Sequence, residues 1–161
     1  MTREEILAGA YKCFFEAMKK GWAAGVKAVP VPGMPGYKEI EFQMGDFRLL
    51  DRYCVSDAGS AGTKTIWYQD KPVWFMSYGG HYPKEVIPFL KHALMLNYEC
   101  CQFNGGRGPK SFREHHLYPD MIYQNNANFG STFEGFKGVE IVIAVGRPPL
   151  GQHEYFGMAL I

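Results

Sequence analysis

Glu140 is the residue whose type and position most clearly suggest a chemical role. It lies in the apolar run Val139-Glu140-Ile141-Val142-Ile143. In a strand, alternation places Glu140 on the same face as Val142 and Ala144. A lone buried carboxylate is very costly, so this side chain needs either water or a partner. It is therefore either a structural carboxylate, solvated or ion-paired, or a general base or ligand anchor. Lys64 holds the matching place in the first half of the chain, which makes a Lys64–Glu140 ion pair one hypothesis.

The only basic cluster is Arg107-Gly108-Pro109-Lys110, together with Arg113, His115 and His116. Turn amides and a guanidinium group both donate hydrogen bonds, so such a loop can hold a phosphate or a carboxylate. The cluster lacks the Gly-x-x-x-x-Gly-Lys-Ser/Thr pattern of a P-loop. It is thus either an anion cradle anchored on Arg107 or a solvated basic loop.

Patterns for a metal site or a catalytic nucleophile do not occur in the sequence. The five histidines form neither H-x-x-x-H nor H-E-x-x-H, and the four cysteines contain no C-x-x-C. Gly59-Ser60-Ala61-Gly62 does not match the G-x-S-x-G nucleophile elbow, and Cys54 is better explained by packing. We therefore expect no metal and no cofactor, and the sequence favours a protein that is not an enzyme.

Aromatic residues concentrate between Trp67 and Gly80, a stretch that is typical of two strands joined by a tight turn. Alternation puts Trp74, Met76 and Tyr78 on one face, so one face can pack under helices while the other lines a cavity or a partner surface. Binding of nucleic acid is disfavoured because basic side chains are sparse along this hairpin. The predicted ligand pocket combines aromatic walls with two polar anchors: Trp67, Trp74, Tyr78 and Tyr155, with Glu140 and Arg107.

Two helices are predicted, one at the start of each half. Thr2 to Lys20 carries apolar residues at spacings of three and four, and Thr2 with Glu5 fits a capping box. Pro83 to Asn97 has a second apolar stripe. Gly21 to Gly36 is a Gly/Pro connector without regular structure, either a covering loop or a mobile lid.

Period-two alternation predicts four antiparallel strands from Tyr37 to Tyr78. The second half predicts four more, at Phe112–Leu117, Asp120–Asn126, Val139–Val145 and Gln152–Ile161. The shared order indicates an internal repeat of about 1–80 and 81–161. We predict one α+β domain spanning 1–161, built from two pseudo-repeats of a helix plus four strands. They would form a mainly antiparallel curved sheet or barrel with two packed helices.

Four short motifs follow one another along the chain in an order that is also found in a known protein family. They are Pro72 to Gly79, Phe89-Leu90 with Ala93-Leu94, Arg107-Gly108-Pro109, and Phe136 to Glu140. With them the chain resembles, over nearly its whole length, a bacterial family of unknown function. Members of that family occur alone or behind an XRE-type helix-turn-helix in transcriptional regulators. The resemblance implies no chemistry, and this sequence shows no DNA-binding part, so a regulator role does not follow. Ser60 and Lys64 depart from the Phe and Glu of the family pattern.

Composition limits the remaining function classes. The chain has 161 residues, 47% of them apolar, which is enough to bury one core. A net charge of +1 gives no global attraction to nucleic acid or anionic membranes, and no apolar run is long enough to span a bilayer. The absence of a signal-peptide pattern and the unpaired cysteine spacing lead us to expect a cytoplasmic protein. The favoured function is a small-molecule-binding or sensor-like domain. The alternatives are a homodimeric interaction module and an enzyme that uses Glu140 as acid or base.

Overall fold

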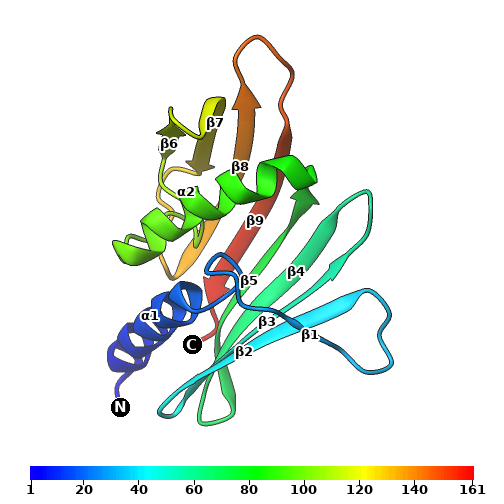
Figure 1. Cartoon of the computed structure of the whole chain (residues 1–161). Helices are drawn as coiled ribbons and strands as arrows, with labels where there is room; N and C mark the ends of the chain where they lie inside the picture. The colour runs from blue at the N-terminus through cyan, green and yellow to red at the C-terminus, as the bar shows by residue number, and fades with distance from the viewer.

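The computed structural model describes residues 1–161 and shows two α-helices on one nine-stranded antiparallel sheet (Figure 1). The predicted α+β class is therefore confirmed. The elements in chain order are α1 (Arg3–Lys19), β1 (Val29–Pro30), β2 (Tyr37–Met44), β3 (Phe47–Val55), β4 (Ser60–Tyr68), β5 (Lys71–His81), the 3₁₀ turn η1 (Lys84–Val86), α2 (Ile87–Glu99), β6 (Ser111–Glu114), β7 (Tyr118–Ala127), β8 (Gly135–Ala144) and β9 (Gly151–Ala159).

Helix α1 begins where the sequence predicts. The Glu5 amide donates to Thr2 Oγ1 at 3.2 Å, and the Thr2 amide donates to the Glu5 carboxylate at 2.7 Å, so the capping box is confirmed. Helix α2 begins later than predicted, because the 3₁₀ turn η1 precedes it. Pro88 sits in the first turn of α2, where its missing N–H would have no helical partner in any case.

The strand order is β1-β2-β3-β4-β5-β9-β8-β7-β6, with every neighbouring pair antiparallel. The sheet stays open, so the barrel alternative is wrong. Its edge strand β1 lies inside the connector that the sequence predicts to be irregular; Pro30 fits there because an edge strand pairs on one side only. Strand β6 is shorter than the predicted Phe112–Leu117, because Glu114 accepts hydrogen bonds from the amides of the following turn.

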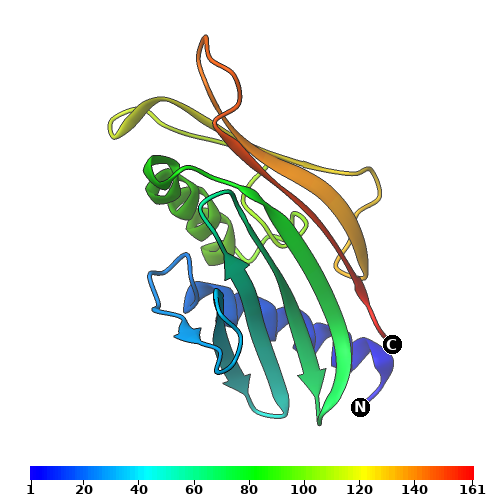
Figure 2. The ribbon, with the colours of Figure 1, turned by 90° about the vertical axis from the view of Figure 1, so that its right-hand side faces the viewer.

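Both helices lie on the same face of the twisted sheet, and the opposite face carries no helix (Figures 1 and 2). The core between the two layers is rich in aromatic residues. Trp74 of β5 packs against Phe14 of α1, and Phe89 of α2 packs against Tyr118 of β7, both with ring centroids 5.3 Å apart. Neither helix is long and apolar enough to cross a membrane.

One helix followed by four antiparallel strands occurs twice, leaving β1 aside, and the last strands of the two halves, β5 and β9, are neighbours. Tyr78 and Tyr155 are cross-strand partners on these two strands. Each of these tyrosines also lies opposite a glycine of its own half, Gly62 in β4 and Gly138 in β8. These correspondences agree with the expected repeat, and the duplication itself stays a prediction.

Candidate functional site

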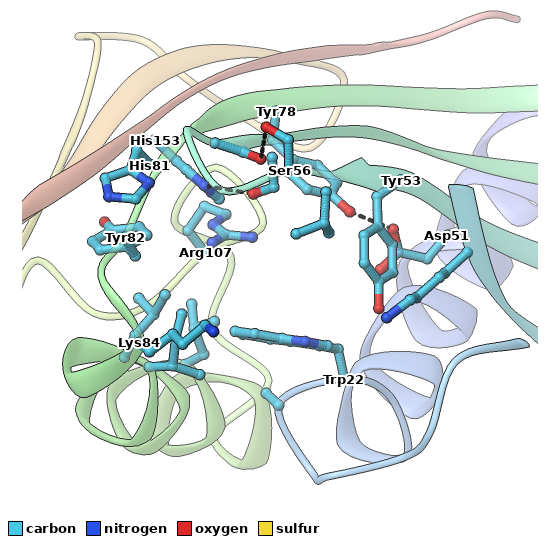
Figure 3. A pocket seen from close by; sticks show the side chains of 18 of the residues that line it. Trp22, Asp51, Tyr53, Ser56, Tyr78, His81, Tyr82, Lys84, Arg107 and His153 are labelled. Atoms are coloured by element: carbon cyan, nitrogen blue, oxygen red, sulfur yellow. Dashed lines mark hydrogen bonds between the residues drawn. The ribbon is translucent and has the colours of Figure 1, made fainter. Parts of the chain in front are cut away.

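The fold holds a cavity of about 680 Å³ between the sheet, helix α2 and the segment that follows α1 (Figure 3). Trp22 and Leu90 contribute to its apolar wall, while strands β3, β4, β5 and β9 contribute polar groups. One end is formed by Arg107, Ser60, Tyr82 and His153, and we call it the Arg107 end. The mouth is marked by exposed side chains that include Lys38, Ser56, Asp57 and Lys84.

Glu140 lies directly behind Arg107 and is fully buried. One carboxylate oxygen accepts a hydrogen bond from Arg107 Nη2 in an ion pair, and the other accepts from the Tyr123 hydroxyl at 2.7 Å. Tyr123 in turn accepts from the Gly108 amide at 2.9 Å. Both carboxylate oxygens are thus paired, which offsets the cost of burying the charge. The solvated alternative for Glu140 is wrong, and an ion-paired carboxylate describes the structure.

A second buried ion pair joins Lys64 of β4 to Asp51 of β3, with 2.9 Å between Nζ and Oδ2. The Tyr78 hydroxyl donates to the other oxygen of Asp51 at 2.6 Å, and Lys64 Nζ lies 4.1 Å from the Tyr78 ring centroid. The hypothesis of a Lys64–Glu140 ion pair is therefore wrong. The register explains the difference, because Lys64 lies opposite Asp51 and Met76, whereas Glu140 lies opposite Asn125 and His153.

Burial and charge act together on the pKa values of these groups. Burial lowers the pKa of Lys64, while Asp51 acts in the opposite direction. Burial raises the pKa of Tyr78, and Asp51 adds to the rise. Burial also opposes the charge of Arg107, but Glu140 acts in the other direction together with Tyr98 and Tyr123, and the pKa of the guanidinium lies well above its ordinary value. The cavity wall thus carries two charged pairs and tyrosines that stay protonated.

The loop that carries Arg107 is fixed by two asparagines. Asn97 of α2 donates to two loop carbonyls at 2.7 Å, and Asn125 of β7 donates to two others at 2.8 Å. The Tyr155 hydroxyl donates to Asn125 Oδ1 at 2.6 Å and so orients this amide. Arg107 is consequently only 4% exposed, and the solvated-loop alternative is wrong for this residue.

His153 of β9 completes the Arg107 end. Its Nε2 lies 3.3 Å from Ser60 Oγ, while its buried Nδ1 has no hydrogen-bond partner. Burial lowers the pKa of His153 to about 4, and the positive charge of Arg107 adds to the shift. The ring is therefore neutral at pH 7, next to an arginine that is always charged.

Of the six residues predicted to form the pocket, three form or support the cavity wall, two are buried elsewhere, and one lies on the other face of the sheet. Tyr78 and Arg107 line the cavity, and Glu140 supports Arg107 from behind. Trp74 is in the core, where its indole N–H donates to the Phe133 carbonyl at 2.8 Å. Tyr155 is buried against Asn125.

Trp67 is the member of that set that lies farthest from the predicted role. It is on the helix-free face, because the neighbouring positions Lys64 and Ile66 point toward the helices. There the Arg48 guanidinium carbon lies 4.0 Å from the Trp67 ring centroid. The cavity therefore has neither Trp67 nor Trp74 in its wall.

Four cavity residues, Trp22, Ser60, Tyr82 and His153, were not predicted from the sequence. They lie after α1, at the start of β4, just before η1 and in β9, so no local spacing connects them. A partial signal was present in β9, where His153 and Tyr155 alternate with charged or exposed neighbours and therefore share the buried face.

Fold and site together define an α+β protein whose open antiparallel sheet holds a cavity with two buried ion pairs beneath its helices. The chain belongs to the family described as a domain of unknown function (DUF5680), which it matches over residues 51–158. This span contains all four members of the two ion pairs, whereas α1 and Trp22 lie outside it. No curated protein and no solved structure matches the chain. The expected link to helix-turn-helix regulators stays a prediction.

Proposed function

We propose that this protein binds a small organic molecule in the cavity of Figure 3, either as a simple binding domain or as a sensor-like one. The observation that carries the proposal is the cavity itself. Its volume of about 680 Å³ lies within the range of roughly 300–1,000 Å³ that small-molecule sites occupy. An apolar wall with a few fixed polar groups is also the usual composition of such sites.

The polar groups of the wall already have partners that hold them in place. Lys64 and Tyr78 are held by Asp51, and the Arg107 guanidinium carbon, held by Glu140, lies 5.5 Å from the Tyr78 ring centroid. The two ion pairs are thus connected through one aromatic ring. Fixed groups lose little conformational freedom when a ligand binds, which favours affinity.

Binding without chemistry fits the geometry better than catalysis by Glu140. Ser60, His153 and Glu140 follow one another in space as the nucleophile, base and acid of a hydrolase triad do. However, the 3.8 Å between His153 Nδ1 and Glu140 Oε1 is too long for a hydrogen bond, and Glu140 is already engaged by Arg107 and Tyr123. A histidine whose pKa is about 4 is also a weak general base at pH 7.

A thermal-shift panel tests the proposed function. Nucleotides, sugar phosphates, amino acids, aromatic acids and drug-like cations are expected to include at least one stabilising ligand. A ligand at ~1,000 times its dissociation constant adds about 4 kcal/mol to the free energy of unfolding, which raises the unfolding midpoint by several degrees. Ile87→Trp, which enlarges a cavity-wall side chain of α2, should abolish the shift. Leu96→Trp, on the exposed side of α2, is the matched control. A flat panel, or a shift that Ile87→Trp leaves unchanged, would contradict the proposal.

A homodimer through the helix-free face of the sheet is a second candidate function. Phe156 and Met158 of β9 are each 47% exposed there, and Phe75 lies beside Phe156 with ring centroids 6.2 Å apart. Large apolar side chains exposed together in the middle of a sheet favour a partner surface. Native mass measured at micromolar concentration should then be that of a dimer, and Phe156→Asp should return it to the monomer. A monomeric wild-type protein would count against this candidate.

A further inference from the structure

We infer, on the basis of the proposed function, that the Arg107 end of the cavity is a subsite for an oxyanion. The oxyanion would be the carboxylate or phosphate group of the bound molecule, with its apolar part lying toward Trp22 and Leu90. The chemical class of the ligand is thereby an organic anion with an aromatic or aliphatic body. The evidence is the distribution of paired and unpaired hydrogen-bonding groups on the cavity wall.

The carboxylates on and behind the polar wall of the cavity already have partners. The buried carboxylates of Asp51 and Glu140 are each engaged by one cation and one tyrosine. The Tyr82 and Tyr98 hydroxyls donate to backbone carbonyls, both at 3.2 Å. A cationic ligand would therefore meet no free carboxylate here.

The charged side chains that keep unused hydrogen-bonding groups on this wall are donors. Arg107, although only 4% exposed, has an Nε without a partner, and Figure 3 shows its guanidinium pointing into the cavity. Lys64 carries three protons on Nζ and has one carboxylate partner. His153 adds a second buried nitrogen without a partner, Nδ1, which is a donor in the tautomer that carries the single proton of the neutral ring there. Buried donors that lack an acceptor cost free energy, and an oxyanion supplies the acceptors.

The charged side chains at the mouth of the cavity also favour an anion. Lys38 and Lys84 are exposed on the cavity wall, and neither has a carboxylate within ion-pair distance. Asp57 is the one acidic side chain of the wall outside the buried pairs. Two unpaired lysines against one aspartate attract anions to the opening.

Four aromatic probes of similar size separate the charge requirement from the apolar contact: 2-naphthoate, 2-naphthyl phosphate, 2-naphthamide and 2-naphthylmethylammonium. Calorimetric titration at pH 7 and low salt is expected to show at least one anion binding about tenfold or more tightly than the amide, since hydrogen bonds to charged groups are the strong ones. The ammonium probe should bind most weakly. The carboxylate and phosphate arms also identify which oxyanion the subsite prefers.

Two variants locate the anion. Arg107→Gln/Glu140→Gln removes the guanidinium without leaving its buried partner charged, and it should reduce the preference for the anion over the amide to less than about threefold. Lys84→Gln at the mouth leaves the buried pairs intact, so it serves even if the double variant does not fold. It should weaken anion binding about two- to threefold at low salt and less at high salt. Lys137→Gln, exposed on the helix-free face, is the control that should change neither value.

An amide or ammonium probe that binds as tightly as the anions would overturn the oxyanion assignment and leave the cavity as the ligand site. An anion preference that survives both variants would place the anion outside the cavity and would also overturn the assignment. If none of the four probes binds, the assignment fails, whereas the proposed function is decided separately by the panel with Ile87→Trp.

Discussion

Glu140→Gln is expected to lower the free energy of unfolding by about 3–5 kcal/mol, because it leaves a buried guanidinium without an anion. Glu140 is fully buried behind Arg107, so no water takes the place of the lost carboxylate on that side of the guanidinium. The substitution also weakens the acceptor of the 2.7 Å hydrogen bond from Tyr123. Urea unfolding followed by tryptophan fluorescence should show a lower midpoint with an unchanged slope.

A surface ion pair provides the matched control. Glu39→Gln removes the carboxylate that pairs with Arg52 at 2.8 Å, and it should cost less than about 1 kcal/mol. The double variant Arg107→Gln/Glu140→Gln should be less destabilised than Glu140→Gln alone, because no unpaired charge remains inside. A loss for Glu140→Gln no larger than that for Glu39→Gln would contradict the role of the buried pair.

The sequence shows that Glu140 needs a partner, but it does not show which one. Alternation in β8 correctly predicts that Glu140 shares a face with Val142 and Ala144, and that face is buried. The partner arrives on a loop whose position depends on Asn97 and Asn125, through hydrogen bonds from side chains to loop carbonyls. Such bonds join α2 and β7 to the loop by tertiary contact, which no local spacing encodes.

The aromatic residues of β5 show a second limit of prediction from the sequence. Trp74 and Tyr78 share one face of the strand, as alternation predicts, yet they have different roles. Phe14 of α1 packs over Trp74, whereas the cavity lies over Tyr78. Helix α1 ends at Lys19, and Trp22 beyond it lines the cavity. The end of a helix thus decides which residue of one strand is core and which is site.

The order of the elements and the direction of the strands are the parts of the fold that the sequence predicts best, because alternation and helical periodicity are local properties. Closure of the sheet is not local. A barrel would require the edge strands β1 and β6 to pair, and no residue pattern within a single strand determines whether they do. Strand β1 was not predicted, because the Gly/Pro content of the connector indicates irregular structure and a strand of two residues at a sheet edge gives only a weak pattern.

Acidification is expected to destabilise this protein through His153 by up to about 3 kcal/mol between pH 6.5 and pH 4. Burial, with Arg107 in support, lowers the pKa of His153 from 6.5 to about 4 in the folded protein. In this window the unfolded chain binds a proton at His153 that the folded protein does not. The stabilisation is therefore fully present above pH 6.5 and is lost as the pH falls toward 4. Urea unfolding at several pH values measures it.

His153→Gln isolates this contribution, because glutamine can still hydrogen-bond to Ser60 but takes up no proton. The variant should lose about 3 kcal/mol less stability than the wild type on going from pH 7 to pH 4. His115→Gln, exposed in the turn after β6, should follow the wild-type curve. The wild type and His153→Gln share the charged and titratable groups around this position, so the titration of those groups largely cancels in the difference. These groups are Glu140, Arg107, Lys64, His81 and Tyr82. Parallel curves for the wild type and His153→Gln would mean that His153 is not held neutral by its surroundings, and the environment described for the Arg107 end would be wrong.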